Sequence, residues 1–138
     1  MIELAVCGNN CNYCPRYIAT KKGDVKNLKK VAELWEKTGF RNSVESPDII
    51  ACKGCRVEQN CRYGIFECAK EKGVDNCGQC EDYPCENISE VFDKAKSYKK
   101  IVKRACTKKE YDILNKAFFC KMQTLDKISG INKKKFKF

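Results

Sequence analysis

Cysteine spacing is the feature that most constrains the fold of this chain. Twelve of its 138 residues are cysteines and none is histidine. Ten of the cysteines form one closely spaced series: Cys7, Cys11, Cys14, Cys52, Cys55, Cys61, Cys68, Cys77, Cys80 and Cys85. The series contains three Cys-x2-Cys pairs, a spacing with which a tight turn directs two sulfurs at one metal ion. Without histidine, a closed site must be made of thiolates, which favours zinc or an iron–sulfur cluster.

Disulfides are the other use of so many cysteines, and they belong to secreted proteins. The segment from Met1 to Cys7 has no basic region, no apolar run of useful length and no small-residue cleavage site, so it does not resemble a secretory signal. No stretch approaches the roughly 18 apolar residues that a membrane span needs. We therefore expect a cytoplasmic protein whose thiols stay reduced and bind metal.

The spacing suggests a division into two sites and leaves two cysteines over. One site would combine two of the pairs: Cys11 and Cys14 with Cys52 and Cys55. The other would use cysteines of a single segment: Cys68, Cys77, Cys80 and Cys85. Cys7 and Cys61 remain as alternative ligands or as thiols near the sites. The expected cofactor is zinc, about two ions per chain, with an iron–sulfur cluster as the alternative.

Hydrophobic periodicity predicts several helices. One spans residues 25–38, between a capping Asp24 and a terminating Gly39, and a short turn follows Ser46. A two-turn helix ends at Gly73 and carries Cys68. Two longer helices are expected at 87–104 and from a capping box at Thr107 to about residue 130. We expect knuckle loops in the remainder of the first 86 residues.

The expected fold is therefore a small, mainly-α, metal-stabilised domain. It consists of a cysteine-rich part (1–86), a C-terminal helical hairpin (87–130) packed on the helix at 25–38, and a basic tail (131–138). Cys106 and Cys120 lie in the hairpin, outside the cysteine series, and are expected to be thiols without a metal.

The formal net charge of +10 raises the question of nucleic-acid binding. Two four-thiolate zinc sites would add eight negative and four positive charges, which leaves about +6. Only five of the 28 basic residues are arginines, although arginine is the usual reader of phosphates and guanine edges. Nucleic-acid binding is therefore expected to be weak and non-specific, if it occurs.

The cysteine series resembles domain-of-unknown-function family 3795. The matching strings are Cys7-Gly8-x2-Cys11-x2-Cys14-Pro15-x-Tyr17, Cys52-Lys53-Gly54-Cys55-Arg56, Cys61-x6-Cys68-Ala69-Lys70-Glu71-Lys72-Gly73-Val74 and Cys77-x2-Cys80-Glu81-Asp82-Tyr83-Pro84-Cys85. The resemblance covers about residues 5–88. It implies a small bacterial or archaeal protein that binds zinc, and it supplies no activity.

A second similarity is confined to Cys7-x3-Cys11-x-Tyr13-Cys14. It is similar to the motif with which radical S-adenosylmethionine enzymes hold a four-iron cluster. Those enzymes enclose the cluster in alternating strands and helices, and this chain shows no such alternation.

Catalytic residues are not identifiable in the sequence. General acid–base catalysis near neutral pH most often uses histidine, which is absent, and a closed four-thiolate zinc has no open position for water. We therefore expect a zinc-stabilised binding or adaptor module, with a protein among its conceivable partners. An iron–sulfur or thiol redox protein is the alternative.

Overall fold

The computed structural model describes residues 4–58 and 63–135, with side chains as far as residue 130. Cys61 and the last three residues of the basic tail lie outside the described residues. The described residues form eight α-helices: α1 (Pro15–Lys22), α2 (Val25–Thr38), α3 (Pro47–Ile50), α4 (Cys55–Glu58), α5 (Ile65–Lys72), α6 (Glu86–Ala105), α7 (Lys108–Leu114) and α8 (Lys121–Lys135). The only β-pairing within the described chain is an isolated bridge between Leu4 and Asn10. The predicted mainly-α fold is confirmed.

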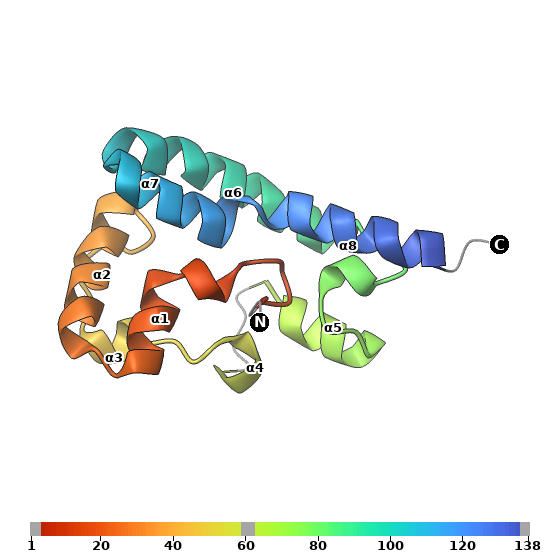
Figure 1. Cartoon of the computed structure of the whole chain (residues 1–138), viewed down its shortest axis with the longest axis horizontal. Helices are drawn as coiled ribbons and strands as arrows, with labels where there is room; N and C mark the ends of the chain where they lie inside the picture. Colours follow the sequence, from red (N-terminus) through yellow and green to blue (C-terminus); the bar gives the residue numbers. More distant parts are fainter. Residues whose placement is uncertain (1–3, 59–62, 136–138) are drawn as a thin grey trace.

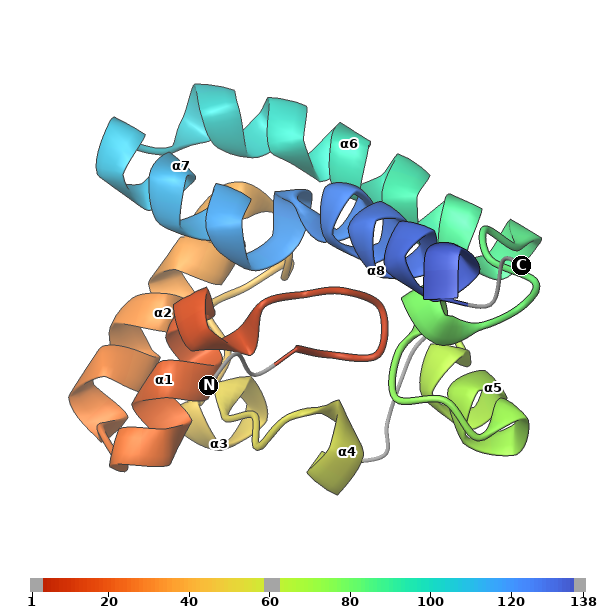
Figure 2. The ribbon, with the colours of Figure 1, turned by 45° about the vertical axis from the view of Figure 1, so that its right-hand side comes forward.

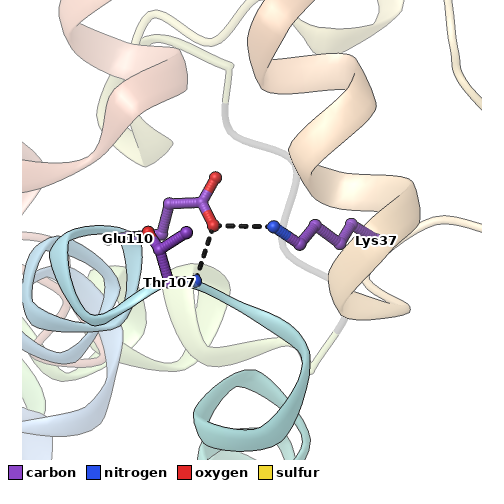
Figure 3. A network of polar contacts seen from close by, with 3 residues as sticks. All are labelled: Lys37, Thr107 and Glu110. Atoms are coloured by element: carbon purple, nitrogen blue, oxygen red, sulfur yellow. Dashed lines mark hydrogen bonds and ion pairs between the residues drawn. The ribbon is translucent and has the colours of Figure 1, made fainter.

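The C-terminal helices form a long hairpin that spans the molecule, with α6 running in one direction and α7 and α8 returning beside it (Figure 1). The predicted capping box starts α7: the Thr107 hydroxyl accepts from the Glu110 N–H, and Glu110 accepts from the Thr107 N–H. Glu110 also forms an ion pair of 2.8 Å with Lys37 at the end of α2 (Figure 3). The turn of the hairpin is thereby tied to α2.

The returning arm of the hairpin is not the single helix that was predicted. It changes to a π-helical turn, η3 (Asn115–Phe119), and breaks at Cys120 before α8 begins. The Ala117 carbonyl in this turn accepts a 2.9 Å hydrogen bond from the Asn10 N–H, so the irregular turn anchors the N-terminal loop. The predicted end near Gly130 is also wrong, because α8 continues to Lys135. A helix interior tolerates glycine at a cost of about 1 kcal/mol.

Two hydrophobic cores lie along the hairpin. At one end, Trp35 of α2 packs with Val102 and Leu114 of the hairpin. At the other end, Ile65 of α5 packs with Ile88 and with further residues of the hairpin. Figure 2 shows the N-terminal loop between these two ends, below the hairpin. The predicted packing of the hairpin against α2 is thus confirmed for one end only, since the other end covers α5.

Helix α1 was expected to be a knuckle loop and is the main correction to the predicted secondary structure. Its single buried residue is Ala19, so the sequence has no apolar stripe that reveals a helix. Its boundaries follow the usual asymmetry, with Pro15 in the first position and Gly23 in the left-handed conformation after the last. A helix this short depends on tertiary packing, here on α2.

Candidate functional site

Helix α1 positions the first group of cysteines, which comprises Cys11, Cys14, Cys52 and Cys55. Cys14 is the N-cap of α1 and is buried. Two turns of this helix hold the chain that leads to Cys52: the Arg16 guanidinium donates to the carbonyls of Ile50 (2.7 Å) and Ala51 (3.1 Å). The Thr20 hydroxyl then accepts from the Cys52 N–H at 2.9 Å. Two cysteines that are 38 residues apart in sequence are thereby held near each other.

The turn between Cys52 and Cys55 has the character of a metal knuckle. The Gly54 N–H donates to the Cys52 sulfur at 3.4 Å, and Gly54 has a φ of +98°. Arg56 follows directly and links three segments, since its guanidinium donates to the carbonyls of Leu4 (2.8 Å) and Asp75 (2.7 Å). The turn is therefore fastened both to the N-terminal loop and to the segment before Cys77.

A cleft of about 870 Å³ adjoins this first group. All four cysteines of the group line it, as does Cys7. The opposite walls come from α6 and from the π-helical turn, through residues such as Tyr98 and Phe118. The first group is therefore accessible to a ligand of substantial size.

The second group comprises Cys68, Cys77, Cys80 and Cys85, and it surrounds a much smaller space. All four line a cavity of about 30 Å³ together with apolar atoms of α5. This volume admits an ion or a water molecule and nothing larger. Cys77 begins the 3-10 turn η2 (Cys77–Gln79), and Cys85 is the N-cap of α6. The second group is thus enclosed where the first is open.

Cys7 lies between the two groups. The Cys77 N–H donates to the Val6 carbonyl at 2.9 Å, which sets Cys7 beside the second group. The ideal Cβ of the next residue, Gly8, would lie 2.9 Å from Leu125 and 3.0 Å from Lys121, so the loop is pressed against α8. Burial lowers the pKa of Lys121, and the neighbouring Cys7 opposes this effect.

The thiol groups influence one another within each group. Burial raises the pKa of Cys11 to about 12, and the thiols of Cys14, Cys55, Cys52 and Cys7 add to the rise. Burial likewise raises the pKa of Cys77 to about 12, assisted by Cys7, Cys85, Cys68 and Cys80. Burial raises the pKa of Cys14 to about 11, against the opposing effect of N–H groups at the start of α1 and of Arg16. These thiols therefore carry their protons at neutral pH in the metal-free chain.

The donor set of each group fits a soft divalent ion. Four thiols, no histidine and a small enclosed space are the composition of a structural zinc site. Among the described residues, however, no three Cys, Asp or Glu side chains are gathered closely enough to form a finished ligand shell. Ligation would therefore require each group to contract until its sulfurs lie about 2.3 Å from the ion.

Several residues that position the groups had no signal in the cysteine spacing. Arg16 and Thr20 are one helical turn apart on α1, and Arg56 reaches carbonyls of two other segments. The sequence gives only a weak signal for these residues: arginine is rare in this chain, and three of the five arginines, Arg16, Arg56 and Arg62, follow a cysteine of the series within two residues. Cys106 and Cys120 lie in the hairpin, and neither lines the cleft or the small cavity.

No described helix is both long and apolar enough to cross a membrane. No curated protein and no solved structure matches the chain significantly. A family model described as "Protein of unknown function (DUF3795)" matches residues 3–90, the segment that contains both cysteine groups. The chain therefore belongs to the DUF3795 family.

Proposed function

We propose that this protein is a zinc-stabilised binding module with two all-cysteine metal sites. The observation that carries the proposal is the enclosure of one small cavity by the four cysteines of the second group. A closed four-thiolate zinc would cross-link α5, η2 and the start of α6, and its role would be structural. The first group also has four thiols, and these line the open cleft. A metal held there would lie beside the cleft, which we propose as the binding surface.

Metal binding by these cysteines requires thiolates, and nearby groups of the chain favour that form. Each thiol must give up its proton to become a ligand, so binding releases protons to solvent. Arg16 supports ligation in the first group because its positive charge favours the thiolate of Cys14. The Gly54 N–H, which donates a hydrogen bond to the Cys52 sulfur, likewise favours the thiolate of Cys52.

Metal analysis of protein purified without oxygen tests the proposal. We expect about two zinc ions per chain and negligible iron. Cys80→Ser should lose one ion, Cys52→Ser should lose the other, and the control Cys106→Ser should retain both. Stoichiometric iron with sulfide would instead establish an iron–sulfur protein, which absorbs near 400 nm.

A further inference from the structure

We propose that the cleft beside the first cysteine group binds a small organic anion with an aromatic or aliphatic body. Its volume of about 870 Å³ lies within the range of roughly 300–1,000 Å³ that is usual for small-molecule sites. The proposal adds a ligand class to the binding module and does not depend on which metal the cysteines hold.

One part of the cleft wall is aromatic. Phe40 is at its centre, with ring centroids 4.9 Å from Tyr98, 5.3 Å from Trp35 and 5.9 Å from Phe118. All three contacts are edge-to-face, an arrangement that holds the rings in place. Phe40, Tyr98 and Phe118 are only partly buried and form a surface for the apolar body of a ligand, whereas Trp35 is buried and supports them from within the core.

The charged residues of the cleft are predominantly basic. Five cations line it: Arg16, Arg41, Lys53, Lys94 and Lys121. Only two acidic residues accompany them, Asp48 and Glu58. Arg41 donates to the Phe40 carbonyl at 3.0 Å, and the described ion pairs, Lys37–Glu110 and Lys72–Asp82, do not involve Lys53, Lys94 or Lys121. A four-thiolate zinc at the first group would add two net negative charges and would still leave the cations in excess.

Lys121 has the environment expected of a ligand-binding cation. It lies at the start of α8 and lines the cleft, and none of the described acidic side chains forms an ion pair with it. An anionic ligand would supply the missing counter-charge in a place where water screens it poorly. The cleft thus pairs an apolar wall with an ammonium group that has no carboxylate partner among the described residues.

Two fluorescent probes with the same aromatic body separate these contributions. Anilinonaphthalenesulfonate is an anion, and N-phenylnaphthylamine lacks the sulfonate. We expect the metal-loaded full-length protein to bind one anionic probe saturably and at least about tenfold more tightly than the neutral one. Equal affinities, or anionic binding only when the protein is unfolded, would overturn the proposal.

Matched lysine variants locate the charge. Lys121→Met should lower the affinity for the anionic probe about fivefold or more and leave the affinity for the neutral probe unchanged. Lys127→Met, an exposed lysine on the same helix outside the cleft, should change neither. The same loss in both variants, or no loss in Lys121→Met, would contradict the proposal. Should Lys121→Met fail to fold, Lys94→Met should give a loss in the same direction, and an unchanged affinity there would count equally against it.

The aromatic wall is tested separately. Tyr98→Ala should weaken both probes, provided that circular dichroism shows a folded protein, and unchanged binding of both would place the probes elsewhere. Displacement of the anionic probe by a poly-glutamate peptide at lower concentration than by a small aromatic carboxylate would overturn the proposal in favour of an acidic protein segment.

Discussion

The two cysteine groups have the same donors and opposite surroundings. The first group joins segments 38 residues apart and faces a cleft of about 870 Å³, whereas the second is drawn largely from one segment and encloses about 30 Å³. The first depends on side chains of α1 for its alignment. Three cysteines of the second group, Cys77, Cys80 and Cys85, pack against a hydrophobic core, which Cys55 alone of the first group also touches. The comparison teaches that access, rather than donor type, distinguishes the two cysteine groups.

The largest expected effect comes from removing a thiol of the second group. Cys80→Ser should cost about 3 kcal/mol or more in the free energy of unfolding, because the enclosed site would lose its proposed metal and the cross-link that the metal would provide. Cys52→Ser should lose an ion as well, with a smaller loss of stability. Denaturant unfolding of the metal-loaded variants measures the loss of stability in each.

Cys120→Ser serves as the control, since it is expected to cost about 1–2 kcal/mol as an ordinary change at a partly buried position between two helical segments. Equal losses in Cys52→Ser and Cys80→Ser would remove the distinction between the two groups.

Glycine substitutions sharpen the same contrast. Gly78→Ala should destabilise by about 2–3 kcal/mol, because its Cβ would lie 2.9 Å from the Leu125 carbonyl and 3.0 Å from Ile128. Gly54→Ala in the first group should cost about 1–2 kcal/mol from its positive φ alone, since its Cβ meets only the Tyr17 ring, at 3.4 Å. Thermal melts compare the two variants. A larger loss in Gly54→Ala would show that the first group is the more tightly packed one.

The metal-free chain should become less stable as the pH rises above about 9. The pKa of Cys11 and that of Cys77 are raised to about 12 in the folded chain, from an ordinary value of 9.0. Between these values the unfolded chain has released protons that the folded chain retains, so stability decreases with pH. Unfolding of chelated protein at pH 8, 9 and 10 tests this.

Cys11→Ser and Cys77→Ser should each reduce this slope, one for each group. A slope that is unchanged in both variants would mean that other groups cause the loss. With zinc bound the dependence should reverse near neutral pH, because binding displaces protons.

The smallest effect is expected at the ion pair between α2 and α7. Lys37 holds the pKa of Glu110 below its ordinary value, helped by the Thr107 N–H. The stability from this pair is therefore present above the ordinary glutamate pKa and disappears as the pH falls through the lowered value. Glu110→Gln should slightly lower the denaturation midpoint at pH 7, and this loss should shrink as the pH falls through the lowered pKa of Glu110. A loss of the same size throughout the acid range would assign the effect to the capping box alone.

Sequence patterns determined those elements whose cause is local. Helix α2 has a complete apolar stripe between Asp24 and Gly39, and the capping box at Thr107 needs only residues three positions apart. The cysteine spacing likewise suggested the two groups, because turns of two residues restrict where neighbouring sulfurs point.

Tertiary structure alone decided the features that depend on distant contacts. Helix α1 lacks an amphipathic pattern, and its position depends on packing against other helices. No local sequence pattern predicts the π-helical turn, which accepts a backbone hydrogen bond from the Asn10 N–H. The position of Cys7 follows from a backbone hydrogen bond between Val6 and Cys77. The cleft is lined jointly by residues of α1, of the turn at Cys52 and of the hairpin, which are distant from one another in sequence. Spacing along the chain specifies which residues are close in sequence, whereas the space enclosed between helices is set by the packing of side chains from both cores.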